Sequence, residues 1–302
     1  MPATVVSEAA FSNAIEPGIK KVFTSAFNEE APDSLVGLMY KVTDSDKANE
    51  DYREIEDLGN VPDFTGELSF TDFKEGNGKT LTPTQKALGL KIQRTFVDDD
   101  LYGIINAMVA QMGTVNRYRI EQDAASPFVN AFNSTFTTFD GLSLCNSAHA
   151  YVSTTTTQSN TGVLPFSYAN LDSTQTSMRK FKNSQDRFIA TMKPDMLFGP
   201  VDLETQFTEV IQSELKAGTA NNDMNVFNRK FKIVTSVHLT DTNNWFLIDS
   251  KKMKEWLIWQ QRIPLEFSRT KDFDTFTPKW ASYMRYVNSP LNWQWIFGHT
   301  VS

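Results

Sequence analysis

Residues 59–100 read GNVPDFTGELSFTDFKEGNGKTLTPTQKALGLKIQRTFVDDD, and this stretch decides the fold. Apolar and polar side chains alternate in its first part and again in its last part, which is the period-two pattern of a half-buried strand. The pattern predicts a long hairpin over residues 59–96. The apolar positions are Phe64, Leu68 and Phe70 on the outgoing arm and Leu88, Leu90, Ile92 and Phe96 on the return arm.

The reversal of this hairpin is predicted at Glu75-Gly76-Asn77-Gly78. Two glycines and an asparagine there allow the positive backbone angles of a tight turn. Pro83 lacks a backbone N–H, so we expect the return arm at the edge of a sheet or in an irregular stretch. A two-stranded hairpin alone is marginally stable in water, which implies a partner surface. A meander packed on its own domain explains the same periodicity, and the pattern leaves both interpretations open.

The residues before the hairpin divide into an arm and a connector. Pro17 is tolerated in a first helical turn, and apolar residues follow it at helical spacing as far as Phe27. We therefore expect a short amphipathic helix that begins at Pro17. Residues 44–57 are acidic, and we interpret them as a solvated connector.

The hairpin leads into the most regular helical pattern of the chain. Asp98-Asp99-Asp100 supplies carboxylates that cap free N–H groups at a helix start and match the helix dipole. A helix is predicted over residues 98–124, ending before Pro127, as a strut of the fold. Consecutive carboxylates diverge from a helix start, so capping is favoured over a metal site. The recurring apolar residues are Leu101, Ile104, Ile105, Met108, Met112 and Val115.

Beyond this helix the composition changes. Residues 128–161 are rich in Ser, Thr and Asn, which predicts loops with short edge strands and a domain boundary. After the boundary the chain alternates between helical and strand patterns. Helices are predicted over 171–188 and 203–215, and strands over 196–198, 232–238, 245–248, 256–258, 280–287 and 293–297.

The composition narrows the possible functions. A formal net charge of −7 argues against a surface built to wrap duplex DNA, because such binding needs clustered Lys and Arg. The single cysteine, Cys145, excludes a disulfide within the chain. The N-terminus lacks the pattern of a secretion signal, and no apolar stretch has the length of a membrane helix. We therefore expect no membrane partner and no secretion by that route.

Catalytic and binding motifs are weak. Gly78-Lys79-Thr80 ends like a phosphate-binding loop, but the glycine that this motif requires five residues earlier is Phe73, so a hairpin tip is preferred. Cys145 and His149 lie four residues apart, yet nothing signals an orienting residue or an oxyanion site. We predict no catalytic, cofactor-binding or metal-binding residues. The histidines, which we interpret as satisfied polar groups without ligand spacing, are His149, His238 and His299.

Several short stretches of the sequence follow one another in a characteristic order along the chain. They are Tyr52-Arg53-Glu54-Ile55, Gly59-Asn60-Val61-Pro62-Asp63-Phe64, Lys86-Ala87-Leu88-Gly89-Leu90, Asp99-Asp100-Leu101-Tyr102, Asp140-Gly141-Leu142-Ser143-Leu144 through His149, Pro194-Asp195, Trp245-Phe246-Leu247-Ile248-Asp249 and Trp293-Gln294-Trp295-Ile296-Phe297-Gly298-His299. With these strings the chain resembles the major capsid proteins of tailed bacteriophages. More specifically, it is similar to the Mu-type major head subunit family.

This resemblance implies an α+β protein with the Hong Kong ninety-seven fold. Its parts are an N-terminal arm, an extended loop hairpin, a peripheral domain with a long spine helix, and an axial α/β domain. Carried onto this sequence, the expected bounds are 1–42 for the arm, 43–58 for a connector or peripheral strand, 59–96 for the extended loop, 97–162 for the peripheral domain with its spine helix at 98–124, 163–267 for the axial domain, and 268–302 for strands returning to the peripheral domain.

The resemblance also implies a function. Such subunits form pentamers and hexamers that close into an icosahedral shell around double-stranded DNA, without enzymatic activity or a cofactor. The expected partners are other copies of the chain and scaffolding, portal or decoration proteins, and the expected location is the virion, after assembly in the bacterial host cytoplasm. A surface adhesin or carbohydrate-binding module is the alternative, suggested by the tract Thr154–Thr157 and the tryptophan-rich C-terminus.

Overall fold

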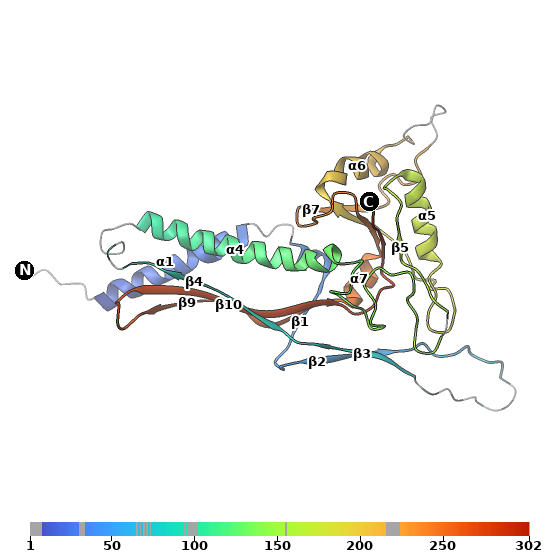
Figure 1. The fold of residues 1–302 in the computed structure, drawn as a ribbon, viewed down its shortest axis with the longest axis horizontal. Helices are drawn as coiled ribbons and strands as arrows, with labels where there is room; N and C mark the ends of the chain where they lie inside the picture. Colours follow the sequence, from blue (N-terminus) through green and yellow to red (C-terminus); the bar gives the residue numbers. More distant parts are fainter. Residues whose placement is uncertain are drawn as a thin grey trace, which may run out of the picture.

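Two larger sheets, two long helices and a projecting hairpin make up the fold in the computed structural model of this chain (Figure 1). The structure describes residues 8–29, 34–64, 66, 68, 70, 72, 74–93, 95, 102–154, 156–215 and 224–301, with side chains of the first helix from residue 18. Asp98-Asp99-Asp100, the predicted helix cap, lies outside the described residues. The helices are α1 (Glu8–Glu29), α2 (Leu35–Met39), α4 (Tyr102–Val129), α5 (Tyr168–Arg179), α6 (Glu204–Gln212), α7 (Ser250–Trp256) and the short 3-10 helix η1 (Val201–Leu203).

The long sheet gives the molecule its narrow half, and α1 and α4 lie along it (Figure 1). Its strand order is β1-β9-β10-β4. The antiparallel strands β9 (Leu257–Lys271) and β10 (Pro278–Pro290) form its centre. β1 (Lys41–Asp44) pairs with β9 in parallel, and β4 (Thr84–Lys91) pairs with β10 in the antiparallel direction.

The sheet and α4 hold each other through one face of β10. Trp280, Met284 and Tyr286 alternate as buried residues along this strand, as expected where a strand has one covered face. Between them, the hydroxyl of Ser282 accepts a hydrogen bond from Asn116 Nδ2 at 2.9 Å, so the buried polar groups of helix and strand satisfy each other. The amphipathic strand is therefore covered by the helix.

The second sheet forms the wider half of the molecule. Its strands, in spatial order, are β5 (Thr161–Gly162), β11 (Ile296–His299), β8 (Trp245–Ile248), β6 (Met196–Pro200) and β7 (Lys232–Ser236). β6 and β7 run parallel, while β8 is antiparallel to β6 and β11. Helices α5 and α6 accompany this sheet (Figure 1). Ser167 caps α5 by accepting a hydrogen bond from the N–H of Asn170 at 3.2 Å.

The hairpin predicted over residues 59–96 is wrong in its arms as well as in its turn, because the described residues between 56 and 74 form no strand and the return arm pairs with β10. The strands β2 (Glu50–Ile55) and β3 (Glu75–Leu81) pair with each other, so the loop that joins them is residues 56–74 and the predicted turn is the start of β3. The glycines there serve close packing between strands. A Cβ added at Gly76 would lie 3.1 Å from the side chain of Glu54, and one at Gly78 would lie 3.0 Å from Arg53. Glycine is common where another chain segment approaches closely.

The return arm behaves as predicted at Pro83. This proline stands in the two-residue break between β3 and β4, and β4 is an edge strand of the long sheet. Leu90 lies opposite Trp280 in the register with β10. The return arm from Thr84 to Lys91 therefore packs on its own domain, as the alternative interpretation of the periodicity predicted.

The long helix continues beyond its predicted end. It includes Pro127 and stops at Val129. A proline inside a helix leaves the carbonyl four residues earlier without its usual N–H donor. Here that carbonyl, of Asp123, accepts hydrogen bonds from Ser126 Oγ at 2.6 Å and from Asn288 Nδ2 at 2.7 Å. Tertiary contacts of β10 thus compensate for the proline.

The arm helix begins earlier than predicted. Because α1 starts at Glu8, Pro17 lies inside the helix and not in its first turn. The apolar pattern correctly predicted the buried face, since Ile19 and Phe23 pack with Val109 and Met112 of α4. The pattern begins at Pro17, which led to the wrong start.

Several other predicted elements differ from the structure in their bounds or in their place. α5 ends at Arg179 and α6 at Gln212, whereas their helices were predicted to reach 188 and 215. Trp256 ends α7 and does not begin a strand. The fifteen-residue β9 was predicted only at its first residues, because Pro264 breaks its pattern at a register shift opposite Tyr283 and Arg285. β11 joins the second sheet beside β8 and does not return to the long sheet.

The contact between α1 and α4 depends on Gly113. A Cβ at this position would lie 2.7 Å from the carbonyl oxygen of Phe23, which is backbone and cannot rotate away. We predict that Gly113→Ala lowers the free energy of unfolding by about 1–3 kcal/mol, although alanine is the better helix former. Urea denaturation measures the change.

Gly103 provides the matched control, because it lies in the same helix and an added Cβ meets nothing within 4 Å. Gly103→Ala should leave stability unchanged or raise it. Equal effects of the two substitutions would show that α1 and α4 do not approach closely at Gly113.

Candidate functional site

The loop at residues 56–74 exposes a row of large apolar side chains. Val61, Phe64 and Phe70 are 96%, 72% and 92% exposed, and Leu58 and Leu68 are exposed as well. Exposed single apolar residues are ordinary on protein surfaces, but five large ones within one short loop make it a candidate interaction site. These five side chains are thus largely uncovered by their own chain.

The base of the loop is fixed to the body by hydrogen bonds. Glu56 Oε1 accepts from the backbone N–H of Ser153 at 3.0 Å, and the backbone N–H of Asp57 donates to Ser184 Oγ at 2.9 Å. Arg187 donates to the carbonyl of Leu58 and to Asn60 Oδ1. Residues 56–60 with these contacts form the loop anchor.

Two buried carboxylates, Glu54 and Glu56, lie close together at the start of the loop anchor. Glu54 and Glu56 are 8% and 5% exposed, although the acidic connector was predicted to be solvated. Burial, followed by the charges of Glu56, Asp140 and Asp57, raises the pKa of Glu54 from its ordinary value of 4.5 to about 7. Glu54 Oε1 accepts a hydrogen bond from Asn292 Nδ2 at 3.3 Å. The prediction of a solvated connector is therefore wrong for its last residues.

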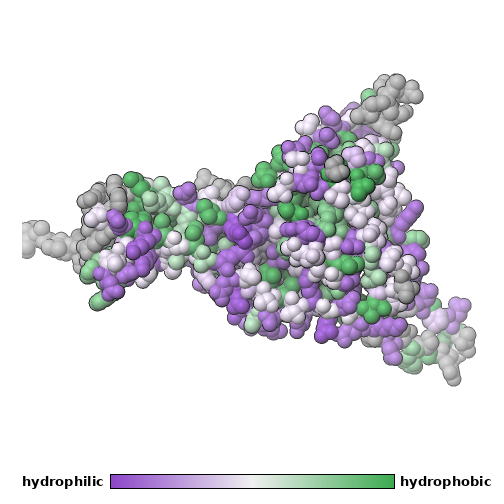
Figure 2. All heavy atoms as spheres, in the orientation of Figure 1, coloured by the Kyte–Doolittle hydropathy of each residue, from purple (hydrophilic) through white to green (hydrophobic). Residues whose placement is uncertain are grey.

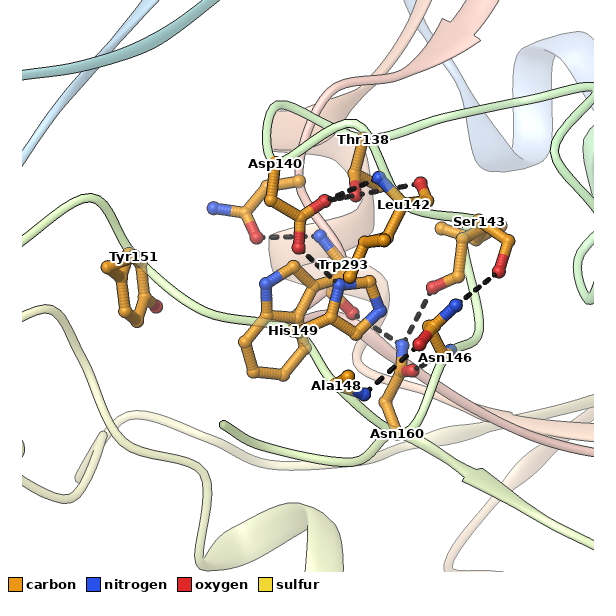
Figure 3. Close-up of polar contacts among 12 residues, drawn as sticks. Thr138, Asp140, Leu142, Ser143, Asn146, Ala148, His149, Tyr151, Asn160 and Trp293 are labelled. Atoms are coloured by element: carbon orange, nitrogen blue, oxygen red, sulfur yellow. Dashed lines mark hydrogen bonds and ion pairs between the residues drawn. The ribbon is translucent and has the colours of Figure 1, made fainter. Parts of the chain in front are cut away.

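Asp140 and His149 form a buried pair next to the anchor (Figure 3). His149 Nδ1 lies 2.5 Å from Asp140 Oδ2, and the imidazole stacks on Trp293 with ring centroids 4.6 Å apart. Burial alone would raise the pKa of Asp140, but the hydrogen bond and charge of His149, with the donors Thr138 and Leu142, together lower it. The pair links the segment 138–149 to the residues before β11.

Asn160 completes this network (Figure 3). Its Oδ1 accepts from the N–H of Asn146 at 2.8 Å, and its Nδ2 donates to the carbonyl of Leu144 at 2.8 Å. Nδ2 also lies 3.3 Å from the carbonyls of Trp293 and Ile296. One buried amide thus joins two chain segments, which is a structural role.

Cys145 and His149 do not form a catalytic pair. Cys145 is buried against Gly298 of β11, where an added Cβ would lie 2.7 Å from Sγ. Burial raises the pKa of the thiol well above its ordinary value, so the thiolate that a nucleophile needs is disfavoured. His149 directs its Nδ1 to Asp140 instead. The two side chains belong to different contacts.

Gly78-Lys79-Thr80 lies within β3, so it is neither a phosphate-binding loop nor the predicted hairpin tip. Lys79 Nζ donates to the carbonyls of Thr137 and Pro290, and burial lowers its pKa to about 8. The lysine therefore fastens the hairpin to the body.

The other two histidines, His299 and His238, both make structural contacts. His299 Nδ1 accepts from the N–H of Leu164 at 3.1 Å, and its Nε2 lies 2.8 Å from Thr174 Oγ1. Burial lowers the pKa of His299 to about 4, which matches a neutral ring with two partners. His238 packs its ring edge-on against Tyr118. Among the described residues, no group of three or more His, Cys, Asp or Glu side chains could hold a metal ion.

The anchor carboxylates are the site residues that sequence reasoning missed. Tyr52, Glu54 and Glu56 share one parity in a strand, which would have indicated a common face. Charge, however, predicts exposure, and nothing in the sequence shows that Asn292, Ser153 and Asp140 approach this face.

Further apolar surface lies away from the loop. Ile104, Met108 and Val115 are exposed on one side of α4, and Phe273 is 90% exposed at the end of the β9–β10 hairpin. Figure 2 shows hydrophobic surface at the narrow end of the molecule and further hydrophobic patches scattered among hydrophilic surface over the wider half. No helix in the described parts of the chain is both long and apolar enough to cross a membrane.

Comparison with known proteins identifies the class. A sequence profile described as phage capsid protein matches residues 78–297, which is most of the chain. No curated protein matches the sequence. The chain therefore belongs to the phage capsid protein family, and it is a structural protein of the phage shell.

Solved structures support the fold. The procapsid protein of bacteriophage JBD30 matches with a TM-score of 0.55 and 15% identity, covering 97% of this chain and 76% of that one. The capsid of cyanophage P-SCSP1u matches with a TM-score of 0.60 and 12% identity, covering 89% and 88%. A virus-like particle from Pyrococcus furiosus matches with a TM-score of 0.54 and 10% identity, covering 94% and 98%.

The expected α+β architecture with the Hong Kong ninety-seven fold is thereby confirmed, as is the resemblance to tailed-phage capsid proteins. Nothing in these matches supports the adhesin alternative. The finer resemblance to the Mu-type head subunits stays a prediction.

The Asp140–His149 pair should stabilise the fold near neutral pH. A carboxylate with a lowered pKa contributes stability above the carboxyl's unfolded value and loses it as the pH falls through the folded value. We predict that Asp140→Asn lowers the free energy of unfolding at pH 7 by about 1–3 kcal/mol, and that the difference narrows below about pH 4.

Urea denaturation across this pH range measures the effect. Asp46→Asn, at an exposed carboxylate, is the control and should change little. A constant difference between wild type and Asp140→Asn at all pH values would contradict the role assigned to the charge.

Proposed function

We propose that this chain is the major subunit of an icosahedral shell, built from pentamers and hexamers around double-stranded DNA. The observation that carries the proposal is the exposure of five apolar side chains, Leu58, Val61, Phe64, Leu68 and Phe70, in a loop whose base is anchored to the body. Burying Phe64 and Phe70 on a neighbouring copy would remove about 150–250 Å² of aromatic surface for each ring from water. Many such contacts around a closed ring add up to a stable shell.

The parts of the molecule take distinct roles in this proposal. The long sheet with α1 and α4 corresponds to the peripheral domain, α4 to its spine helix, and the five-stranded sheet with α5 and α6 to the axial domain. The extended loop is the β2–β3 hairpin with residues 56–74. The helical part of the arm packs on α4 of its own subunit, so contact with a neighbour falls to other surfaces.

The partners follow from the same role. Other copies of the chain are the principal partner, and scaffolding, portal and decoration proteins complete the particle, assembled in the host cytoplasm. The net charge of −7 suits a container that encloses DNA without gripping it. We propose no enzymatic activity, since the thiol is buried and its candidate base is engaged elsewhere.

The loop side chains provide the direct test. We predict that Val61→Ser, Phe64→Ser and Phe70→Ser together leave the subunit folded, because these side chains are exposed. The triple variant should fail to form rings or shells, because the apolar contact is lost. Electron microscopy and sedimentation of the purified protein, with scaffold supplied, measure assembly.

A matched control changes polar residues of the same loop, Asp63→Asn and Asp72→Asn, and should still assemble. Shell formation by the triple variant at wild-type yield would remove the loop from the contact. A wild-type protein that stays monomeric at high concentration would contradict the shell function itself.

Cys145 tests the proposed absence of chemistry. We predict that Cys145→Ala assembles normally and loses about 1 kcal/mol of stability, because one buried atom is removed from the packing beside Gly298. Electron microscopy and urea denaturation check both parts. Loss of assembly with unchanged stability would indicate that the thiol has a chemical function.

A further inference from the structure

The loop anchor concentrates negative charge at the point where the loop leaves the body. Glu54 ends the inward face of β2, and Glu56 and Asp57 follow it directly. Asp140 comes from the body, already paired with His149. Oε2 of Glu56 is buried and has no hydrogen-bond partner among the described residues. Like charges in a poorly solvated place repel each other strongly.

The nearby cations are engaged elsewhere. Arg53 pairs with Glu75 on the exposed side of the hairpin, and Lys182 pairs with Asp186. Lys79 donates to the backbone carbonyls of Thr137 and Pro290. Arg187 donates to the carbonyl of Leu58 and to Asn60, so it holds the loop and not the carboxylates. Among the described residues, the hydrogen-bond donor to the Glu54 side chain is the neutral amide of Asn292.

The hydrogen bonds that dock the loop are few and local. The donors are the N–H groups of Ser153 and Asp57, the hydroxyl of Ser184, which donates to Asp57 Oδ2 at 3.2 Å, and the side chain of Arg187. All of these bonds involve residues 56–60 of the loop. Beyond residue 60 the apolar side chains are exposed. Loosening this short stretch would therefore free the whole loop without breaking either large sheet.

We propose that the loop anchor is a pH-dependent latch, in which protonated Glu54 keeps residues 56–60 docked on the body and ionised Glu54 releases them. The release belongs to the single subunit. Its consequence, that a freed loop can turn toward a neighbouring copy, rests on the proposed function.

The sign follows from linkage. A carboxyl whose pKa is higher in the docked state than in the free state favours docking fully below its free value, and this favour is lost as the pH rises through the docked value. Glu56 and Asp57, which leave with the released stretch, are among the charges that raise the pKa of Glu54 to about 7, so this pKa is higher in the docked state. The docking equilibrium should therefore fall between pH 5.5 and 8.5. Tyr151, another titratable neighbour, has its pKa raised by burial and by the carboxylates, so it stays neutral here.

Hydrogen exchange of the unassembled wild-type chain tests the latch. The readout is the protection factor of the Asp57 and Ser153 amides. Because this factor is the intrinsic exchange rate divided by the measured rate, the pH dependence of intrinsic exchange cancels. Both factors should fall together between pH 5.5 and 8.5. Amides of β9 and β10 serve as an internal reference and should not change.

Two variants sharpen the result. Glu54→Gln keeps the acceptor for Asn292 and removes the charge, so protection should stay high at every pH. Glu56→Gln keeps the acceptor for Ser153 and removes the largest neighbouring charge, so the midpoint should move to lower pH. Glu75→Gln changes an exposed carboxylate of the same hairpin and should behave like wild type.

Protection that is independent of pH in the wild type, or that falls equally in Glu54→Gln, would overturn the latch. Because the readout uses unassembled subunits, this result is independent of shell formation. Failure of the wild type to assemble at any pH, with the exchange transition intact, would instead overturn the shell function.

Discussion

The packing around the C-terminal end of α4 is the contact on which the rest of the structure depends. Phe128 meets Phe198 and Phe246 of the second sheet edge-on, with ring centroids 4.7 and 5.8 Å apart. One turn earlier, Asp123 accepts a hydrogen bond from Tyr286 of the long sheet at 2.7 Å. The same helix end therefore contacts both sheets. Because close packing there is rigid, it fixes the directions of the loop at residues 56–74 and of the β9–β10 hairpin.

Much of this arrangement could be predicted from local pattern. The helical spacing of α4, the short apolar runs of β6 and β8, and the proline that places β4 at an edge are all local signals in the sequence. The predictions failed where distant residues decide. At Pro127, Asn288, far along the chain, helps the local Ser126 replace the lost donor. Gly76 and Gly78 suggested a turn, but they make room for Glu54 and Arg53 across the strand pair. The anchor carboxylates looked solvated because charge is the stronger local signal.

A subunit of this kind must fold stably as a monomer and still expose apolar surface that only a neighbouring subunit covers. Its cores are closed by large aromatic residues, including Trp245 and Trp295, which are fully buried. Its loop, by contrast, keeps phenylalanine side chains in water, at an energetic cost that burial against a partner would remove. The loop anchor joins the buried core to this exposed loop. Its hydrogen bonds hold the loop on the body, and repulsion between its neighbouring carboxylates weakens that docking.

Solvent accessibility of the loop before and after assembly tests the central claim most directly. Hydroxyl-radical labelling of Phe64 and Phe70 can be compared between isolated subunits and purified shells of the same protein. The account predicts strong labelling in the subunit and marked protection in the shell, while the buried Phe198 stays unlabelled in both. Equal labelling of Phe64 and Phe70 in subunit and shell would show that the loop does not pack on a neighbouring copy.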